Sequence, residues 1–192
     1  MLLQILTYTH HLTTMLFGIF LSAFFLGVKQ NKKNVCILLG GGAVSGLFFL
    51  ICNTVFGSLF TEAVYPIFVH LPLFLLLVFY YRFRWLPSII SIMTAYLCCQ
   101  FSNWAGIFAL SLSGLDWVYY LVRIIVTVAV FAFLSRYLCQ TTALLFAKSD
   151  RELYILGAMP FVYYVFDYST TKFSMLLYSG NKVVVEFLAF AM

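Results

Sequence analysis

Long apolar runs separated by short polar connections dominate the chain. Because a helix needs about 20 mostly apolar residues to cross a bilayer, we identify six runs as spans. They are Leu12–Val28, Val35–Ser58, Val64–Tyr81, Leu86–Leu112, Trp117–Leu138 and Leu153–Tyr178, and the first helix could begin several residues earlier. A further run, Val183–Met192, is too short to span and is expected to be a partial last helix. The pattern predicts an all-α fold, a polytopic transmembrane bundle with six full spans plus a truncated seventh, forming one integral-membrane domain over residues 1–192.

Local signals mark particular points within this pattern. Ser149 and Glu152 have the spacing of a capping box, which predicts a helix start there. Pro72 and Pro160 lie inside spans, where the missing N–H predicts a kink.

The second span contains two glycines in a spacing that lets helices approach closely. Gly42 and Gly46 form this GxxxG pattern. Two interpretations stay open, namely tight packing inside one bundle and dimerisation with a second copy of the chain.

Composition agrees with a membrane protein and excludes other classes. Hydrophobic residues make up 64% of the chain and charged residues only 9%, against about 25% charged residues in soluble domains. An aromatic content of 20% excludes a disordered chain. The five cysteines show neither a CxxC pair nor a Cys/His ligand spacing, so we expect no disulfide framework, no metal and no cofactor. The net charge of +5 is scattered, so we expect the lipid bilayer, and no nucleic acid, as partner.

Basic residues are distributed unequally over the connections. Alternate connections, beginning with the first, carry eight of them: Lys29, Lys32, Lys33, Arg82, Arg84, Arg136, Lys148 and Arg151. The other connections carry only Lys182, together with the acidic Glu62 and Asp116. Because basic loops stay in the cytoplasm, this asymmetry predicts a multi-pass protein whose N-terminus lies outside.

Polar and ionisable residues inside the spans gather toward the predicted outer side. They are His70, Asn103, Arg123, Asp167 and Lys172, although an ionisable residue costs about 2.5–3.5 kcal/mol on insertion. Helical spacing extends the group into one polar stripe on each of three spans. The stripe of the sixth span contains Asp167, Thr170, Thr171, Ser174 and Tyr178. That of the fifth contains Tyr120, Arg123 and Thr127, and that of the fourth contains Tyr96, Cys99, Asn103 and Gly106. Such stripes are expected to face the bundle interior.

Two interpretations of these residues stay open. In the first, Arg123 and Asp167 form a structural ion pair, while His70 and Asn103 bond to backbone. In the second, an outward-opening pocket binds an extracellular ligand, and Arg123 or Lys172 meets its anionic group. The candidate ligand-binding residues are His70, Asn103, Arg123, Asp167, Thr171 and Lys172. Lys172 could instead extend toward the outer headgroups.

His10 and His11 are a tempting pair near the N-terminus. Adjacent residues on a helix point about 100° apart, so the pair makes a poor metal site. We expect both histidines to be exposed.

Several stretches resemble the membrane region of bacterial GHKL-type sensor histidine kinases. They are Tyr163–Thr171, Leu177–Asn181, Val184–Leu188, His70–Pro72 and Arg82–Arg84, and the resemblance is sharpest from residue 157 to 190. In that family, a bundle of transmembrane helices precedes a cytoplasmic dimerisation and kinase module. The resemblance implies an input domain of a two-component system in the bacterial plasma membrane, sensing an extracellular small molecule or peptide.

The catalytic parts of that family have no counterpart in this sequence. No histidine matches the phosphoacceptor, and the Asn- and Gly-rich boxes that hold ATP are missing. We therefore expect no catalytic residues and no enzyme activity. A fragment, a truncated gene product and a stand-alone relic all fit this pattern, and the incomplete seventh span favours truncation.

Two other functions fit part of the pattern. A six-helix substrate-binding component of a vitamin or metal uptake transporter would match the size and the number of spans, although that class keeps both termini in the cytoplasm. A membrane-embedded enzyme is disfavoured, because the sequence has no HExxH, GxSxG or paired intramembrane aspartate motif.

Overall fold

The computed structural model describes residues 2–57, 64 and 66–172, and the elements in this part of the chain are helices. They are α1 (Leu2–Phe25), α2 (Lys32–Phe56), η1 (Pro66–His70), α4 (Leu71–Leu75), η2 (Leu76–Tyr80), α5 (Trp85–Ser113), α6 (Asp116–Tyr137), α7 (Cys139–Phe146) and α8 (Asp150–Lys172). The prediction of an all-α fold is confirmed. The predicted partial helix 183–192 lies outside the described residues.

The number of spans differs from the prediction. Within the described ranges, three helices and not six are long and apolar enough to cross a membrane, namely α2, α5 and α6. α1 is long, but threonines and histidines occupy its first half. The third run yields only a shorter apolar helix, Ile67–Tyr80. α8 begins with charged residues and carries the polar stripe of Asp167. The first, third and sixth runs therefore do form helices, but these helices are too short or too polar to count as spans.

The third run changes its helix type along its length. π-helical turns form η1 and η2, and the α-helical turn of α4 lies between them. Pro72 lies in the first turn of α4, where its missing N–H cannot donate to the preceding turn. Where the sequence predicted a kink at Pro72, the hydrogen-bonding pattern thus changes from π-helical to α-helical, directly after His70. Pro160 lies inside α8.

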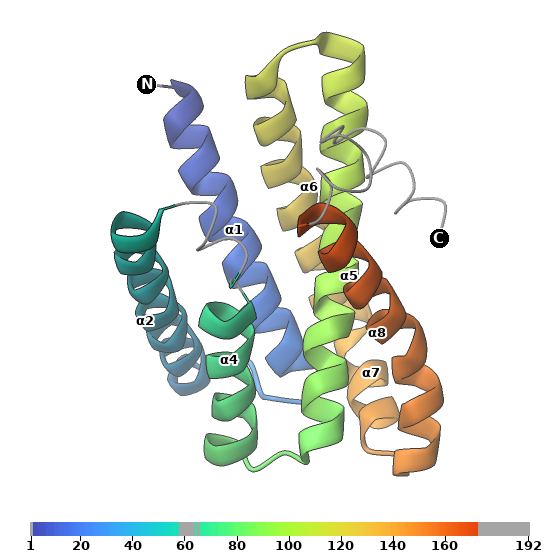
Figure 1. Ribbon diagram of the computed structural model, residues 1–192. Helices are drawn as coiled ribbons and strands as arrows, with labels where there is room; N and C mark the ends of the chain where they lie inside the picture. Colours follow the sequence, from blue (N-terminus) through green and yellow to red (C-terminus); the bar gives the residue numbers. More distant parts are fainter. Residues whose placement is uncertain (1, 58–63, 65, 173–192) are drawn as a thin grey trace.

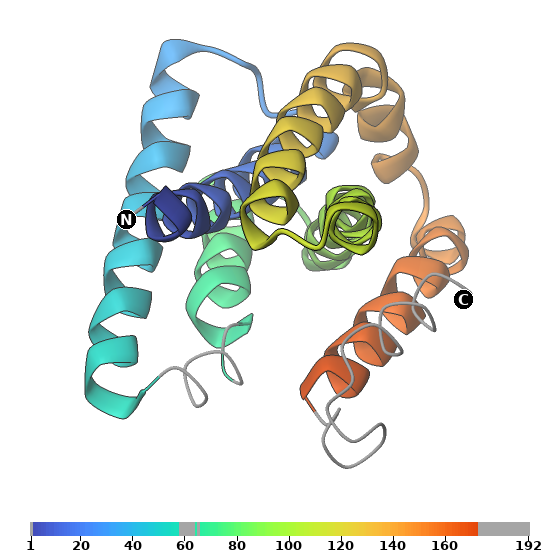
Figure 2. The ribbon, with the colours of Figure 1, turned by 90° about the horizontal axis from the view of Figure 1, so that it is seen from above.

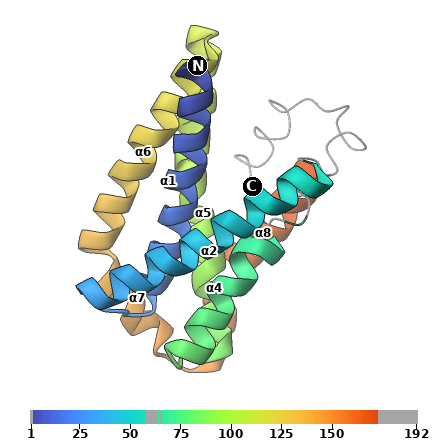
Figure 3. The same ribbon diagram turned by 90° about the vertical axis from the view of Figure 1, so that its left-hand side faces the viewer.

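The helices form two groups that diverge from a common base. α1, α5 and α6 stand side by side, whereas α2, α4 and α8 lean away from them toward the upper end (Figures 1 and 3). Seen from above, α2 and α8 run along opposite flanks of the molecule (Figure 2). We call α1, α5 and α6 the upright group, and α2, η1 to η2, and α8 the inclined group.

The connections alternate between the two ends of the bundle. Those between α1 and α2, η2 and α5, and α7 and α8 lie at the lower end, and the turn between α5 and α6 lies at the upper end, where α1 begins (Figure 1). Gly114 makes that upper turn in the left-handed conformation, with φ +67°, and donates its N–H to the Leu110 carbonyl at 2.8 Å. The eight basic residues of the alternate connections therefore share the lower end, and Asp116 lies at the other.

Small residues allow close helix contacts in the interior. The Ser91 hydroxyl of α5 donates to the Ser22 carbonyl of α1 at 2.5 Å. A Cβ on Gly157 of α8 would lie only 2.7 Å from side-chain atoms of Ile90 in α5. These contacts hold α5 close to α1 on one side and to α8 on the other.

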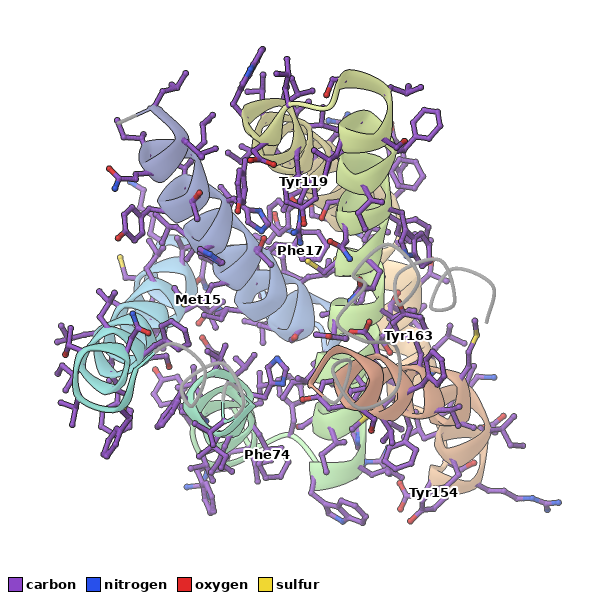
Figure 4. All side chains as sticks on the ribbon, turned by 45° about the horizontal axis from the view of Figure 1, so that its top comes forward. Met15, Phe17, Phe74, Tyr119, Tyr154 and Tyr163 are labelled. Carbon is purple, nitrogen blue, oxygen red and sulfur yellow. The ribbon has the colours of Figure 1, made fainter. Side chains whose placement is uncertain are left out.

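The glycine pair of α2 faces α1. A Cβ on Gly42 would lie 3.1 Å from Ile19, and one on Gly46 would lie 3.5 Å from Met15. Met15 is on the side of α1 that faces α2 in Figure 4. This placement supports packing inside one bundle as the role of the GxxxG pattern.

The predicted helix start at Ser149 is confirmed. The Ser149 N–H donates to the Glu152 carboxylate at 3.3 Å, and the Ser149 hydroxyl donates to it at 3.0 Å. Arg84, in the connection between η2 and α5, binds this corner. Its two terminal nitrogens donate to the Asp150 carboxylate and to the Lys148 carbonyl, both at 2.7 Å. The short helix α7 just before this corner was not predicted from the sequence.

Candidate functional site

His70 lies in the last π-helical turn of η1 and meets two tyrosines. Its Nδ1 is hydrogen-bonded to the Tyr164 hydroxyl of α8 at 2.9 Å. Its ring stands edge-on to that of Tyr96 in α5, with centroids 6.0 Å apart, and the Tyr96 and Tyr164 rings are 4.9 Å apart. His70 thus joins three helical elements through side chains, in contrast to the backbone contact expected in the ion-pair interpretation.

Asp167 of α8 is buried, with 4% of its surface exposed, and receives two donors from α5. The Tyr96 hydroxyl donates to its Oδ2 in a short hydrogen bond. The Gln100 side-chain amide donates to the same oxygen at 3.4 Å. Tyr96 and Gln100 are one helical turn apart, so a single face of α5 holds this carboxyl group.

The same face of α5 continues upward to Arg123. Asn103 donates to the Gln100 side-chain oxygen at 3.3 Å. The Tyr119 hydroxyl of α6 donates to the Asn103 side-chain oxygen at 3.4 Å and accepts a short bond from Arg123 Nη1. The guanidinium carbon of Arg123 also lies 5.1 Å from the Tyr119 ring centroid, which is a cation–π contact.

These contacts form one series that we call the polar network. Its members are His70, Tyr96, Gln100, Asn103, Tyr119, Arg123, Tyr164 and Asp167. It runs from η1 and α8 across α5 to α6, and Figure 4 shows Tyr119 beside the upper parts of α5 and α6. Four of the predicted site residues, namely His70, Asn103, Arg123 and Asp167, therefore belong to one connected structure.

Arg123 and Asp167 occupy different ends of this series. No salt bridge joins them, although both lie in the described part of the chain. Gln100, Asn103 and Tyr119 connect them instead. The interpretation in which Arg123 and Asp167 form an ion pair is therefore wrong, because α5 stands between α6 and α8, which carry the two charges.

Two buried donors on α6 have no acceptor among the described residues. They are Nε of Arg123 and the hydroxyl of Thr127, a residue that is only 2% exposed. The two residues are one turn apart and share the predicted face of α6. An unpaired buried polar group costs about 1–3 kcal/mol, so this face favours a small polar or anionic group as acceptor.

Gly106 makes room for the arginine. A Cβ at Gly106 of α5 would lie 2.9 Å from Cδ of Arg123 and 3.1 Å from the Tyr119 ring. The aliphatic stem of Arg123 therefore lies directly on the α5 backbone. This explains why the sequence places a glycine in the polar stripe of α5.

His10 of α1 lies in the same upper region, contrary to the sequence-based expectation. It is 3% exposed, its Nδ1 lies 3.3 Å from the Thr14 hydroxyl, and its ring centroid is 5.9 Å from that of Tyr120 in α6. Arg123 is a charged neighbour of this ring. His11 is exposed, as predicted.

The remaining candidates cannot be placed in the network. Thr171 and Lys172 are the last two residues of α8, and their side chains lie outside the described residues. The end of the predicted stripe, Ser174 and Tyr178, also lies outside them. Conversely, Gln100 and Tyr164 are network members that the sequence-based selection missed, although Gln100 lies one turn from both Tyr96 and Asn103.

Metal binding finds no support in the described part of the chain, which contains no group of three or more His, Cys, Asp or Glu side chains that could hold a metal ion.

Comparison of the chain with protein-family models, with curated proteins and with solved structures finds no match. The resemblance to sensor kinases therefore stays a prediction. The function has to be argued from the polar network and its surroundings.

Proposed function

We propose that the chain is a membrane-embedded sensor domain that recognises an anionic small molecule or peptide at the Arg123 end of the polar network. In this proposal it is a multi-pass protein of the bacterial plasma membrane, with its N-terminus outside. The observation that carries the proposal is the network itself, since it connects His70, Asn103, Arg123 and Asp167 across helices that belong to both groups.

The network suits signal transfer because its bonds depend on helix positions. The bonds of Asp167 to Tyr96 and Gln100 join α8 of the inclined group to α5 of the upright group. A shift of one group against the other by 1–2 Å, about the size of known helix shifts in switching proteins, would break them. A ligand that binds one arrangement better than the other shifts the population toward it.

Arg123 is suited to the recognition step. Its guanidinium donates to one neutral hydroxyl, that of Tyr119, and no described carboxylate forms a salt bridge with it. A carboxylate or phosphate matches the planar donor fork of arginine better than a hydroxyl does. The unpaired Nε of Arg123 and the Thr127 hydroxyl provide further donors on the same face.

The finer form of the proposal is an input domain of a GHKL-type two-component system. It rests on the resemblance of Tyr163–Thr171 and the neighbouring stretches to that family. Since the sequence contains none of the kinase boxes, phosphorylation would take place in a separate catalytic module.

A chimaera tests this function without knowledge of the ligand. Residues 1–192 are fused to the cytoplasmic dimerisation and kinase module of a GHKL-type kinase, and autophosphorylation is measured in membrane vesicles. Asp167→Asn and Arg123→Gln should change the basal rate at least about fivefold, the lower end of usual coupling strengths. Asp116→Asn is the matched control, because it makes the same chemical change in the first turn of α6. Equal rates in all variants at equal insertion would remove the proposal.

The transporter interpretation makes a different prediction about topology. A reporter fused before Met1 should be active on the outer side of the membrane if the chain is the proposed sensor. An N-terminus in the cytoplasm would favour the uptake component, in which both termini lie inside.

A further inference from the structure

A cavity lies at the lower end of the bundle, away from the polar network. It has a volume of about 260 Å³ and lies between the end of α1, the connection from η2 to α5, and α7. Leu26, Phe83 and Phe146 contribute apolar walls, and Arg82 and Arg84 contribute positive charge. The cavity therefore combines an apolar interior with a basic rim.

The two arginines differ in their partners. Arg84 is neutralised by Asp150, whose carboxylate lies 2.7 Å from Nη1, and it also donates to the Lys148 carbonyl. Arg82 is exposed and has no hydrogen-bond or salt-bridge partner in the described part of the chain. The uncompensated charge of the cavity is thus that of Arg82.

The backbone at Arg82 is fixed by the turn. Its backbone adopts the left-handed conformation, with φ +62°, which residues with a Cβ rarely adopt. Hydrogen bonds fix the residues on both sides, since Tyr81 donates to the Leu76 carbonyl and Phe83 to the Leu77 carbonyl, each at 3.1 Å. The turn therefore places Arg82 beside the cavity, and binding has to order only its side chain and not the backbone.

The surroundings indicate the level of the lipid headgroups. Tyr80 and Trp85 flank the turn and are 50% and 56% exposed, and exposed Tyr and Trp side chains are typical of membrane interfaces. The eight basic residues of the alternate connections share this end of the bundle. Basic pockets between helices on the cytoplasmic side are places where anionic headgroups bind.

We propose that this cavity binds the phosphate-bearing headgroup of an anionic phospholipid. The Arg82 guanidinium meets the phosphate, and the apolar walls from Leu26 and Phe146 contact the first methylene groups of the acyl chains. The bound lipid would bridge α1, the turn before α5, and α7. This site is independent of the sensor function, because it shares no residue with the polar network.

Lipid titration of the full chain in detergent tests the proposal. Native mass spectrometry measures the apparent Kd for phosphatidylglycerol, with phosphatidylcholine as the zwitterionic comparison. We expect Arg82→Gly to weaken phosphatidylglycerol binding about fivefold, the effect of one basic residue at an anionic surface. Because glycine adopts a positive φ without strain, this variant should be at least as thermostable as the natural chain. Lys33→Gln, which removes a charge at the same end outside this cavity, should change the Kd less than twofold.

Two further arms identify the ligand and the place. Ala147→Phe, at the cavity wall and exposed, should weaken binding although all arginines remain. Glycerol 3-phosphate and inorganic phosphate should not displace the lipid at millimolar concentration. Equal losses in Arg82→Gly and Lys33→Gln, or full binding in Ala147→Phe, would overturn the proposal. Displacement by inorganic phosphate would assign the site to a soluble anion and likewise overturn the lipid.

Discussion

Gly106 controls whether Arg123 can lie across α5. A methyl group there would come within 2.9 Å of Cδ of Arg123, so Gly106→Ala forces the side chain away from Tyr119. In the kinase chimaera, we expect Gly106→Ala to change basal autophosphorylation as much as Arg123→Gln does. Because this contact is as tight as the one at Gly157, the change should also cost about 1–3 kcal/mol of stability, so autophosphorylation is compared at equal amounts of inserted, folded protein.

Gly40→Ala is the matched control for this substitution. A Cβ at Gly40 of α2 would have no neighbouring atom within 4 Å. If Gly106→Ala leaves autophosphorylation at the level of Gly40→Ala, the position of Arg123 on α5 does not matter for the output.

Glu152 gives the corner between α7 and α8 a defined response to acid. The hydrogen bond from the Ser149 hydroxyl, followed by that from Lys148, lowers the pKa of Glu152 below its ordinary value. The folded state therefore favours the ionised carboxylate. Its stabilising contribution is complete above the pKa of the unfolded chain and is lost as the pH falls through the lower pKa of the folded chain.

The measurement compares thermal unfolding of the natural chain and Glu152→Gln in detergent from pH 7 downward. The Tm difference between them should be largest near neutral pH and should shrink in the acidic range. Thr54→Val, an uncharged change on the exposed surface of α2, should show a constant difference. A difference for Glu152→Gln that stays constant down to pH 3 would contradict the cap.

At the scale of single residues, the sequence identified the polar members of the network inside the spans better than it identified their hydrogen-bond partners. The cost of polar groups in lipid was enough to single out His70, Asn103, Arg123 and Asp167. The intermediates Gln100 and Tyr164 could not be assigned in the same way, because the partner of a hydroxyl or amide depends on the rotation of each helix. The burial of His10 beside α6 is likewise set by packing, not by its place near the N-terminus.

At the scale of whole elements, hydrophobic runs predicted helices well and spans less well. Each of the six predicted runs contains helix in its described part. Polar residues in α1 and α8, and the short length of Ile67–Tyr80, leave three helices that meet the requirements of a span. α7 was missed because Cys139–Phe146 directly follows α6 in an apolar context, with no turn signal between them.

The crossing of α5 and α8 depends on the absence of a side chain at Gly157. A Cβ there would lie 2.7 Å from Ile90, so Gly157→Ala forces the helices apart. We expect a destabilisation of about 1–3 kcal/mol, as for other overpacked contacts, measured by denaturant unfolding in detergent. The crossing also sets the reach from Asp167 to Tyr96, so the chimaera should show a changed output as well.

A double-mutant cycle isolates this contact. Ile90→Ala alone removes buried apolar surface and should destabilise the fold. In the Gly157→Ala background the same change should cost less, because it relieves the clash, giving a coupling of about 0.5–3 kcal/mol. Additive effects of the two substitutions would show that Gly157 does not limit the approach of these helices.

On the scale of the whole molecule, the polar network joins helices of the two groups. The bond of Arg123 to Tyr119 lies within the upright group, and the bond of His70 to Tyr164 joins η1 to α8. The bonds of Asp167 to Tyr96 and Gln100 cross from α8 to α5 of the upright group. A movement of α8 relative to α5 would therefore change the state of the network at Asp167.

Sidedness determines what this arrangement can sense. The alternate connections with eight basic residues lie at the lower end (Figure 1). The Arg123 end of the polar network lies nearer the upper end, two turns of α6 below Asp116. Single cysteines are introduced by Lys32→Cys and Asp116→Cys after replacement of the five native cysteines. A membrane-impermeant maleimide should label Asp116→Cys in intact cells and Lys32→Cys only after permeabilisation, because basic connections are retained in the cytoplasm. Labelling of Lys32→Cys in intact cells would show that the topology is the reverse of the predicted one. Arg123 would then face a cytoplasmic ligand, and the Arg82 cavity would face the lipids of the outer leaflet.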